Sequence, residues 1–210
     1  MWKLGTRKSR LAVKQVEEFT KYFPSEKFEI VYFETAGDID KTTPISGVEG
    51  SDFFTDTIDR ALLDGEIDLA VHSAKDLPDK LPNGIKVAFV TESIDPNDVL
   101  VSKNNLKLNE LPKGAKVGTS SQRRKEQLIN IRNDLQVLDI RGNIDERLEK
   151  LDKGEYDAII LAGAGLKRLG LENRVTEVLT FSPHPMQGRL AVTTRSCGYA
   201  KGLFSRGRAG

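Results

Sequence analysis

Hydrophobic residues along this chain fall into short runs, separated by stretches whose apolar positions recur with helical spacing. Nine runs rich in β-branched and other apolar residues predict buried strands. They cover residues 2–6, 28–33, 67–72, 85–90, 98–102, 115–118, 135–140, 157–162 and 190–194. Helices are predicted at residues 11–23, 53–63 and 124–131. Asn143, with Glu146 three residues later, has the spacing of a capping box and predicts another helix start. The alternation predicts an α/β fold with mostly parallel sheets flanked by helices.

Two polar segments that contain proline, residues 92–97 and 182–188, divide this pattern into two domains. The strand predicted at residues 190–194 has no helix of its own, so we expect it to return to the sheet of the first domain. Two lobes joined by two crossings form a hinged clamshell with a ligand cleft. The predicted organisation is domain 1 at residues 1–94 and 189–200, domain 2 at 95–184, hinges near 93–97 and 183–188, and a mobile basic tail at 201–210.

Composition narrows the classes of function. The chain has 210 residues, with 32 lysines and arginines against 31 aspartates and glutamates, so its bulk charge argues against nucleic-acid binding. Cys197 is the only cysteine, which predicts no disulfide framework and a reducing, cytoplasmic setting. No run of about twenty apolar residues occurs, so we expect neither a membrane span nor a signal peptide. Two histidines and one cysteine lack the spacing of metal ligands, and no metal site is expected.

Three segments that read as helix starts are loaded with arginine: residues 6–10, 119–124 and 141–147. A helix N-terminus already carries partial positive charge and free N–H groups, so cations there are unfavourable unless an anion joins them. Small hydroxyl residues or glycine beside arginine make such an end an anion site. Three of these segments in one chain predict a ligand with several negative groups.

The sharpest local motif is residues 71–78, where an apolar strand runs into a polar turn that contains Asp76. Sites of α/β proteins lie at such strand ends. A carboxylate there could stabilise a cationic intermediate or transfer a proton. The alternative that the local sequence leaves open is a structural aspartate that caps the turn.

Other polar residues have simpler interpretations. His72 ends a strand and is interpreted as bonding to backbone rather than as an acid–base group. His184, between two prolines, is interpreted as structural. Residues 163–165 indicate close packing of a helix on a strand. Lys167 and Arg168 are typical of a solvated helix face.

Six motifs occur in order along the chain, at residues 6–9, 71–78, 117–124, 141–143, 154–162 and 165–170. Several ordered motifs over most of a chain are far more specific than any single one. Taken together, they resemble one known family, hydroxymethylbilane synthase, also called porphobilinogen deaminase. The resemblance extends to about Arg195.

The resemblance implies a two-lobed fold like that of type II periplasmic binding proteins. It implies a transferase that joins four porphobilinogen molecules head to tail, losing ammonia at each step. The product is hydroxymethylbilane, the linear precursor of haem and related tetrapyrroles. It also implies a dipyrromethane cofactor and a cytoplasmic monomer, without nucleic acid or membrane, whose work is coupled to that of uroporphyrinogen III synthase.

The resemblance also assigns site residues. Asp76 would assist deamination and stabilise the positively charged pyrrole intermediates. The acetate and propionate groups of each pyrrole would be held by Arg7, Ser9, Arg123, Arg124, Arg141 and Arg147. The remaining residues expected at the site are Lys75, Thr119, Ser120, Ser121, Gly142 and Gln187.

Some features depart from the family. A lid that usually carries two lysines corresponds to residues 45–52, with Gly47 and Ser51 at those positions and added negative charge from Glu49 and Asp52. Ala36 stands where an arginine is usual, and Met186 replaces the first glycine of a Gly-Gln-Gly hinge. These changes put substrate capture or chain elongation in question.

The family's third domain, which carries the cysteine that binds the cofactor through a thioether, has no counterpart among these residues. Three interpretations of Cys197 therefore stay open: an inert thiol, a relocated attachment point, or a thiol unrelated to a primer that is held without a covalent bond. Two other functions also stay open. One is a pyrrole or polycarboxylate binding protein without turnover, and the other is a ligand-sensing regulatory domain.

Overall fold

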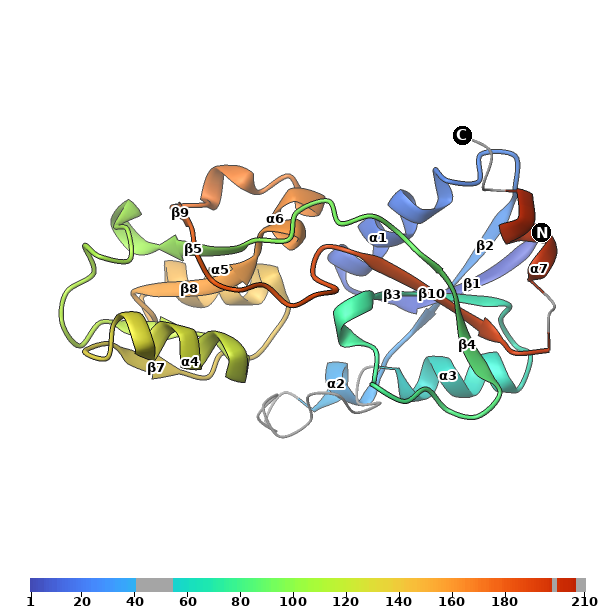
Figure 1. Cartoon of the computed structure of the whole chain (residues 1–210), viewed down its shortest axis with the longest axis horizontal. Coiled ribbons are helices and arrows are strands. Elements are labelled where there is room, and N and C mark those ends of the chain that lie inside the picture. Colours follow the sequence, from blue (N-terminus) through green and yellow to red (C-terminus); the bar gives the residue numbers. More distant parts are fainter. Residues whose placement is uncertain (41–54, 198–199, 207–210) are drawn as a thin grey trace. The chain divides into compact units, whose positions relative to one another are not determined.

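The structure is a computed structural model that describes residues 1–40, 55–197 and 200–206 (Figure 1). The chain forms two compact units. Unit 1 contains the described residues up to Ser93 and those from Arg189 onward, and unit 2 runs from Ile94 to Gly188. The expected lid, residues 45–52, lies outside the described residues. Over the described part of the chain, no helix has the length and apolar character that a membrane crossing requires.

Unit 1 is built on a five-stranded sheet (Figure 1). Its strand order is β2 (Phe28–Phe33), β1 (Trp2–Arg7), β3 (Leu69–Ser73), β10 (Leu190–Arg195) and β4 (Ile85–Val90). Strand β1 is parallel to β2 and β3, whereas β10 is antiparallel to β3 and β4. The return of the chain to the first sheet is therefore as predicted.

Helices cover both faces of this sheet because each has one apolar side. Helix α1 (Arg10–Thr20) buries Val16 and Phe19 against a cluster that includes Leu4. Helix α3 (Asp56–Leu63) buries Ile58 and Leu62 in a second cluster. The shorter elements of unit 1 are helices α2 (Ala36–Ile39) and α7 (Lys201–Arg206) and the 3₁₀ turn η2 (Ala74–Asp76).

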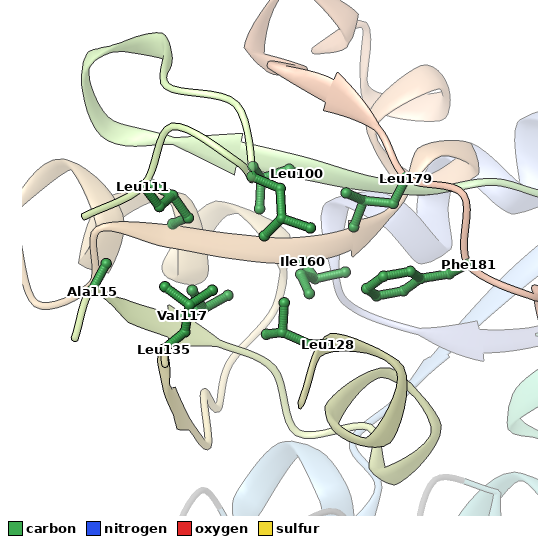
Figure 2. Close-up of a cluster of buried hydrophobic side chains, with 11 residues drawn as sticks. Leu100, Leu111, Ala115, Val117, Leu128, Leu135, Ile160, Leu179 and Phe181 are labelled. Atoms are coloured by element: carbon green, nitrogen blue, oxygen red, sulfur yellow. The ribbon is translucent and has the colours of Figure 1, made fainter. Parts of the chain in front are cut away.

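Unit 2 repeats the plan with a second five-stranded sheet. Its strand order is β7 (Gln136–Leu138), β6 (Lys116–Gly118), β8 (Ala158–Ala162), β5 (Asp98–Ser102) and β9 (Glu177–Val178). The helices are α4 (Gln122–Ile131), α5 (Ile144–Asp152) and α6 (Gly163–Leu169), and the 3₁₀ turns are η3 (Lys103–Asn105) and η4 (Glu172–Arg174). Figure 2 shows the core between the sheet and α4, where Val117, Leu128 and Ile160 meet Phe181.

Both sheets are mixed rather than mostly parallel, which corrects the prediction. Among the described strands, pairings of β10 with β3 and β4, and of β5 with β8 and β9, are antiparallel. The cause is the double crossing, because β5 and β10 follow the crossing segments and each enters a sheet against the direction of its neighbours. Strand β9 was not predicted, since its two residues form no hydrophobic run.

The tail expected to be mobile is in part a docked helix. Helix α7 buries Leu203, which is 1% exposed, and Phe204 stacks on Phe89 with ring centroids 5.8 Å apart. The composition of residues 201–210 hid this, because two apolar side chains among glycines and arginines give no periodic signal. Residues 207–210 lie outside the described part.

Replacing Leu203 by alanine tests this docking. We expect Leu203→Ala to lower the free energy of unfolding by roughly 2–5 kcal/mol, because a buried leucine is lost from a packed core. The matched control Leu63→Ala removes a leucine that is 44% exposed and should change stability by less than about 1 kcal/mol. Urea unfolding followed by circular dichroism measures both. Equal small effects would show that α7 does not pack in solution.

Candidate functional site

The three parallel strands of unit 1 bring candidate residues to one edge of its sheet. Strands β1, β2 and β3 run in the same direction, so the segments that follow them start at the same edge (Figure 1). These segments hold Arg7 and Ser9, then Thr35 with α2, then η2. This edge is where parallel α/β sheets present ligand-binding groups.

Asp76 is exposed at the end of η2, and its carboxylate has no recorded hydrogen bond or ion pair to a described residue. The turn is fastened by other groups. The Gln15 amide donates to the Ser73 hydroxyl at 2.8 Å, and the Ala74 N–H donates to the Arg189 carbonyl at 3.0 Å. The alternative in which Asp76 caps the turn therefore finds no support. Lys75, beside it, is half-buried.

Arg7 meets a carboxylate of its own chain. Its guanidinium donates to both oxygens of Asp38, which also accepts from the Thr35 N–H and hydroxyl in the capping box of α2. Burial alone would raise the pKa of Asp38, but the hydrogen bonds from Arg7 and Thr35 and the Arg7 charge hold it below its usual value. Sequence reasoning missed Asp38, although the Thr35–Asp38 spacing is a capping-box signal. Ser9 caps α1 by accepting from the Ala12 N–H at 3.2 Å.

In unit 2 the parallel strands β6, β7 and β8 lead into α4, α5 and α6. Two of the predicted hydroxyl residues are buried in the loop after β6. The Ser120 hydroxyl donates to the Ile140 carbonyl at 2.8 Å and accepts from the Ile140 N–H at 3.0 Å, which ties this loop to the one after β7. Thr119 is 1% exposed, whereas Ser121, at the N-cap of α4, is half-buried and makes no cap bond. Ser121 is the hydroxyl best able to reach a ligand.

Arg123 and Arg124 share the carboxylate of Asp98. Asp98 Oδ2 accepts from Arg123 Nη2 at 2.5 Å, and Oδ1 accepts from Arg124 Nε at 2.9 Å and from the Gln187 amide at 3.0 Å. Burial by itself would raise the pKa of Asp98, but the Arg124 charge and the three donors hold it below its usual value. Gln187 also donates to the Pro96 carbonyl at 2.7 Å, so this cluster joins both crossing segments. Sequence reasoning missed Asp98.

The third arginine-rich segment is shaped by a capping box. Asn143 and Glu146 exchange bonds at the start of α5, as predicted. Gly142 has φ of 108°, and the Glu146 side chain fills the space where a Cβ would stand, so glycine is required here. Arg147 Nε donates to the Gly142 carbonyl at 2.8 Å, and Arg141 and Arg147 are both half-buried.

Lys167 is exposed, as its interpretation as part of a solvated helix face predicts, whereas Arg168 is half-buried, and both bond to the crossing segments. Lys167 Nζ donates to the Ile94 carbonyl at 3.1 Å, and Arg168 Nη2 donates to the Gly188 carbonyl at 2.9 Å. Nothing in the local sequence identifies these distant acceptors.

Both histidines are structural. His72 is buried and its Nε2 lies 3.1 Å from the Thr193 hydroxyl, so its partner is a side chain rather than the expected backbone. Burial, with a smaller contribution from the Arg7 charge, lowers the pKa of His72 to about 4. His184 Nδ1 accepts from the Met186 N–H within its own turn.

The family model described as porphobilinogen deaminase, dipyromethane cofactor binding domain, matches residues 2–199. The chain belongs to the porphobilinogen deaminase family. It is 43% identical over 202 residues to the porphobilinogen deaminase of Brevibacillus brevis, covering 93% of this chain and 65% of that protein. It is 46% identical over 201 residues to that of Bacillus pumilus, covering 92% and 65%. The chain thus spans less than two thirds of the length of these relatives.

Solved structures show the same two-lobed fold. A periplasmic substrate-binding protein of an ABC transporter from Coxiella burnetii has a TM-score of 0.59 at 14% identity, covering 99% of this chain and 90% of that one. A substrate-binding domain assigned to an amino acid ABC transporter from Streptococcus pneumoniae has a TM-score of 0.54 at 13% identity, covering 99% and 91%. At these identities the likeness shows the fold alone, and it confirms the predicted α/β class.

The dipyrromethane cofactor of the family is attached through a cysteine, and Cys197 is badly placed for this. Leu190 pairs with Ser73, near Asp76, whereas Thr194 pairs with Leu69 at the other end of β3. Strand β10 therefore ends at the edge of the unit 1 sheet opposite Asp76, and the exposed Cys197 follows it there. Arg195 is also engaged elsewhere, donating to the carbonyls of Leu62 and Ile67. The register thus places Cys197 away from the edge of the unit 1 sheet where Asp76 lies.

The lowered pKa of His72 predicts a pH dependence of stability. The folded value of about 4 lies below the unfolded value of 6.5, so the unfolded chain binds more protons in between. The stability gained from a neutral imidazole is complete above the unfolded pKa and is lost as the pH falls through this window. From pH 7 to pH 5 the loss should be about 2 kcal/mol. Urea unfolding at both pH values measures it, and His72→Gln should remove most of the difference. An unchanged pH dependence in that variant would contradict the assignment.

Proposed function

We propose that this chain catalyses the stepwise deaminating condensation of porphobilinogen, the reaction of hydroxymethylbilane synthase. The observation that carries the proposal is the exposed carboxylate of Asp76, whose oxygens accept no hydrogen bond from any described residue. Arginines at helix starts in each unit, and membership of the porphobilinogen deaminase family, support it further.

The chemistry needs one well-placed anion. When ammonia leaves porphobilinogen, the C–N bonding pair departs with nitrogen and a positive charge spreads over the pyrrole. The free α-carbon of an acceptor pyrrole then forms the new C–C bond and loses its proton. Asp76 would stabilise the transient cation and accept that proton, since a carboxylate aimed at developing charge lowers the barrier.

The arginines would hold the acetate and propionate groups of the pyrroles. Arg123, Arg141 and Arg147 are partly accessible, and each lies in or just before the first turn of a helix, where N–H groups favour anions. A charge-assisted contact contributes roughly 1.5–3 kcal/mol. Orienting several carboxylates at once would fix the reacting carbons in register.

This donor set fits the acidic groups of dipyrromethane, which when bound supplies the first acceptor pyrrole. Arg123, Arg141 and Arg147, with Ser121, would hold its carboxylates. Attachment at Cys197 does not fit, because this thiol follows the end of β10 that lies away from Asp76. We therefore infer that this chain retains dipyrromethane through ionic contacts of its own, without a thioether to Cys197.

As a finer inference, we place the protein in the cytoplasm as a monomer. We also expect an enzyme of the uroporphyrinogen III synthase class to consume its linear tetrapyrrole product.

Asp76→Asn tests the catalytic assignment. The amide keeps the shape but not the charge, so ammonia release from porphobilinogen should fall about a hundred-fold or more while binding survives. The control Asp79→Asn changes an exposed aspartate three residues along the chain and should leave the rate unchanged. Near-normal turnover by Asp76→Asn would overturn the role of Asp76. A wild-type protein that binds porphobilinogen and releases no ammonia would instead be a binding protein.

Cys197→Ser tests the retention of the cofactor. We expect the intact mass of the wild-type protein to show no pyrrole adduct at Cys197, and the variant to bind and turn over porphobilinogen like the wild type. An adduct that disappears in Cys197→Ser would restore the thioether at this residue. Peptide mapping identifies the modified residue directly.

A further inference from the structure

We propose that Asp98 is a positioning residue that directs Arg123 toward a carboxylate of the ligand, while Arg124 serves Asp98 and not the ligand. The inference rests on the proposed function only for the identity of the ligand as a pyrrole polycarboxylate. It assigns different roles to the adjacent residues Arg123 and Arg124, which the sequence alone does not distinguish.

The two oxygens of Asp98 have separate partners. Oδ1 accepts hydrogen bonds from Arg124 and Gln187, whereas among the described residues Oδ2 accepts from Arg123 alone. The Asp98 side chain has no exposed surface, so its direction is fixed by these bonds and by its place at the start of β5. A buried acceptor with a fixed direction determines where its donor lies.

Arg123 is held at a second point. Its Nη1 donates to the Ser182 carbonyl, and the Ser182 peptide is itself fixed by Gln127, whose side-chain oxygen accepts from the Ser182 N–H at 2.6 Å. The Arg123 side chain is nevertheless 28% exposed, and within the described residues its Nε has no recorded partner. A guanidinium has more N–H donors than these two bonds use, so Arg123 is fixed in direction and still able to bind an anion.

Arg124 is placed differently. Its side chain is 7% exposed, and each of its nitrogens is engaged: Nε with Asp98, Nη1 with the Ile160 carbonyl, and Nη2 with Asp98 and Gln187. Its donors are directed into unit 2. Two guanidinium cations share one carboxylate, so one positive charge is left over, and Arg123 is the member of the pair that exposes it.

Replacing Asp98 by asparagine separates positioning from simple electrostatics, because the two predict opposite signs. Removing a negative charge near an anion site should tighten the binding of an anionic ligand. If Asp98 positions Arg123, binding should instead weaken about ten-fold or more, the loss of one charge-assisted contact. A purely structural role would leave the affinity per folded molecule unchanged.

The experiment titrates porphobilinogen into wild-type protein, Asp98→Asn and the control Asp134→Asn, counting only folded molecules. Asp134 pairs with Arg132 in the same unit, and its variant should bind like the wild type. The Nε–H signal of Arg123 in nitrogen-15 NMR gives a readout without ligand. We expect a rigid signal in the wild type and in Asp134→Asn, and a mobile one in Asp98→Asn.

Arg123→Lys covers the case in which Asp98→Asn does not fold. Lysine keeps the charge but lacks the planar fork that bonds Asp98 and Ser182 together, so binding should fall about as far as in Arg123→Gln. Wild-type affinity in Arg123→Lys, tighter or unchanged binding in folded Asp98→Asn, or a mobile Arg123 signal in the wild type would each overturn the inference. Failure of the wild type to bind porphobilinogen would overturn the proposed function instead, and the NMR comparison would still test Asp98.

Discussion

The buried carboxylate of Asp98 holds three parts of unit 2 together. Asp98 is withdrawn from water, and an unpaired charge there would cost several kcal/mol. Its partners come from the first turn of α4 and from the second crossing segment, while Gln187 also bonds to the first crossing segment at Pro96. Satisfying this single charge therefore requires three distant parts of the chain to meet. The same meeting orients the first turn of α4, where the candidate ligand contacts begin.

The same electrostatic constraint recurs in unit 1 on a smaller scale. An arginine at a helix start opposes the local partial charge, and the protein answers with a carboxylate of its own. Asp38 does this for Arg7, as Asp98 does for Arg123 and Arg124. A cation at a helix start in the sequence can therefore belong to either of two kinds of arginine, one buried in the fold and one partly exposed. Arg124 is paired and buried within the fold, whereas Arg7 and Arg123 are paired with a carboxylate and still partly exposed.

The sequence predicts local features of the fold, but not which of these arginines are paired with distant carboxylates. Strands β2, β4 and β5 have the bounds predicted from their apolar runs, and the capping box at Asn143 was predicted from a spacing of three residues. Such features depend on neighbours in sequence. The partners of Asp98 lie 25 and 89 residues away, and no local periodicity encodes them. The family resemblance identified the arginines as a set, but only their burial and partners separate Arg124 from Arg123.

The direction of β10 determines where Cys197 lies relative to Gln187 and Asp76. The strand begins three residues after Gln187, beside the end of β3 that leads to Asp76, and it runs antiparallel to β3. A strand that enters a sheet at one edge leaves at the other, here about 17 Å away for a rise of about 3.3 Å per residue. The chain after β10 then packs as α7 on the aromatic cluster of Phe23 and Phe89 rather than turning back. The topology that places Gln187 in the Asp98 cluster is therefore the same one that removes Cys197 from the edge where Asp76 lies. Among the described residues, a cation that stays partly exposed at a helix start can therefore be held in direction by a carboxylate of the same chain, as Asp98 holds Arg123.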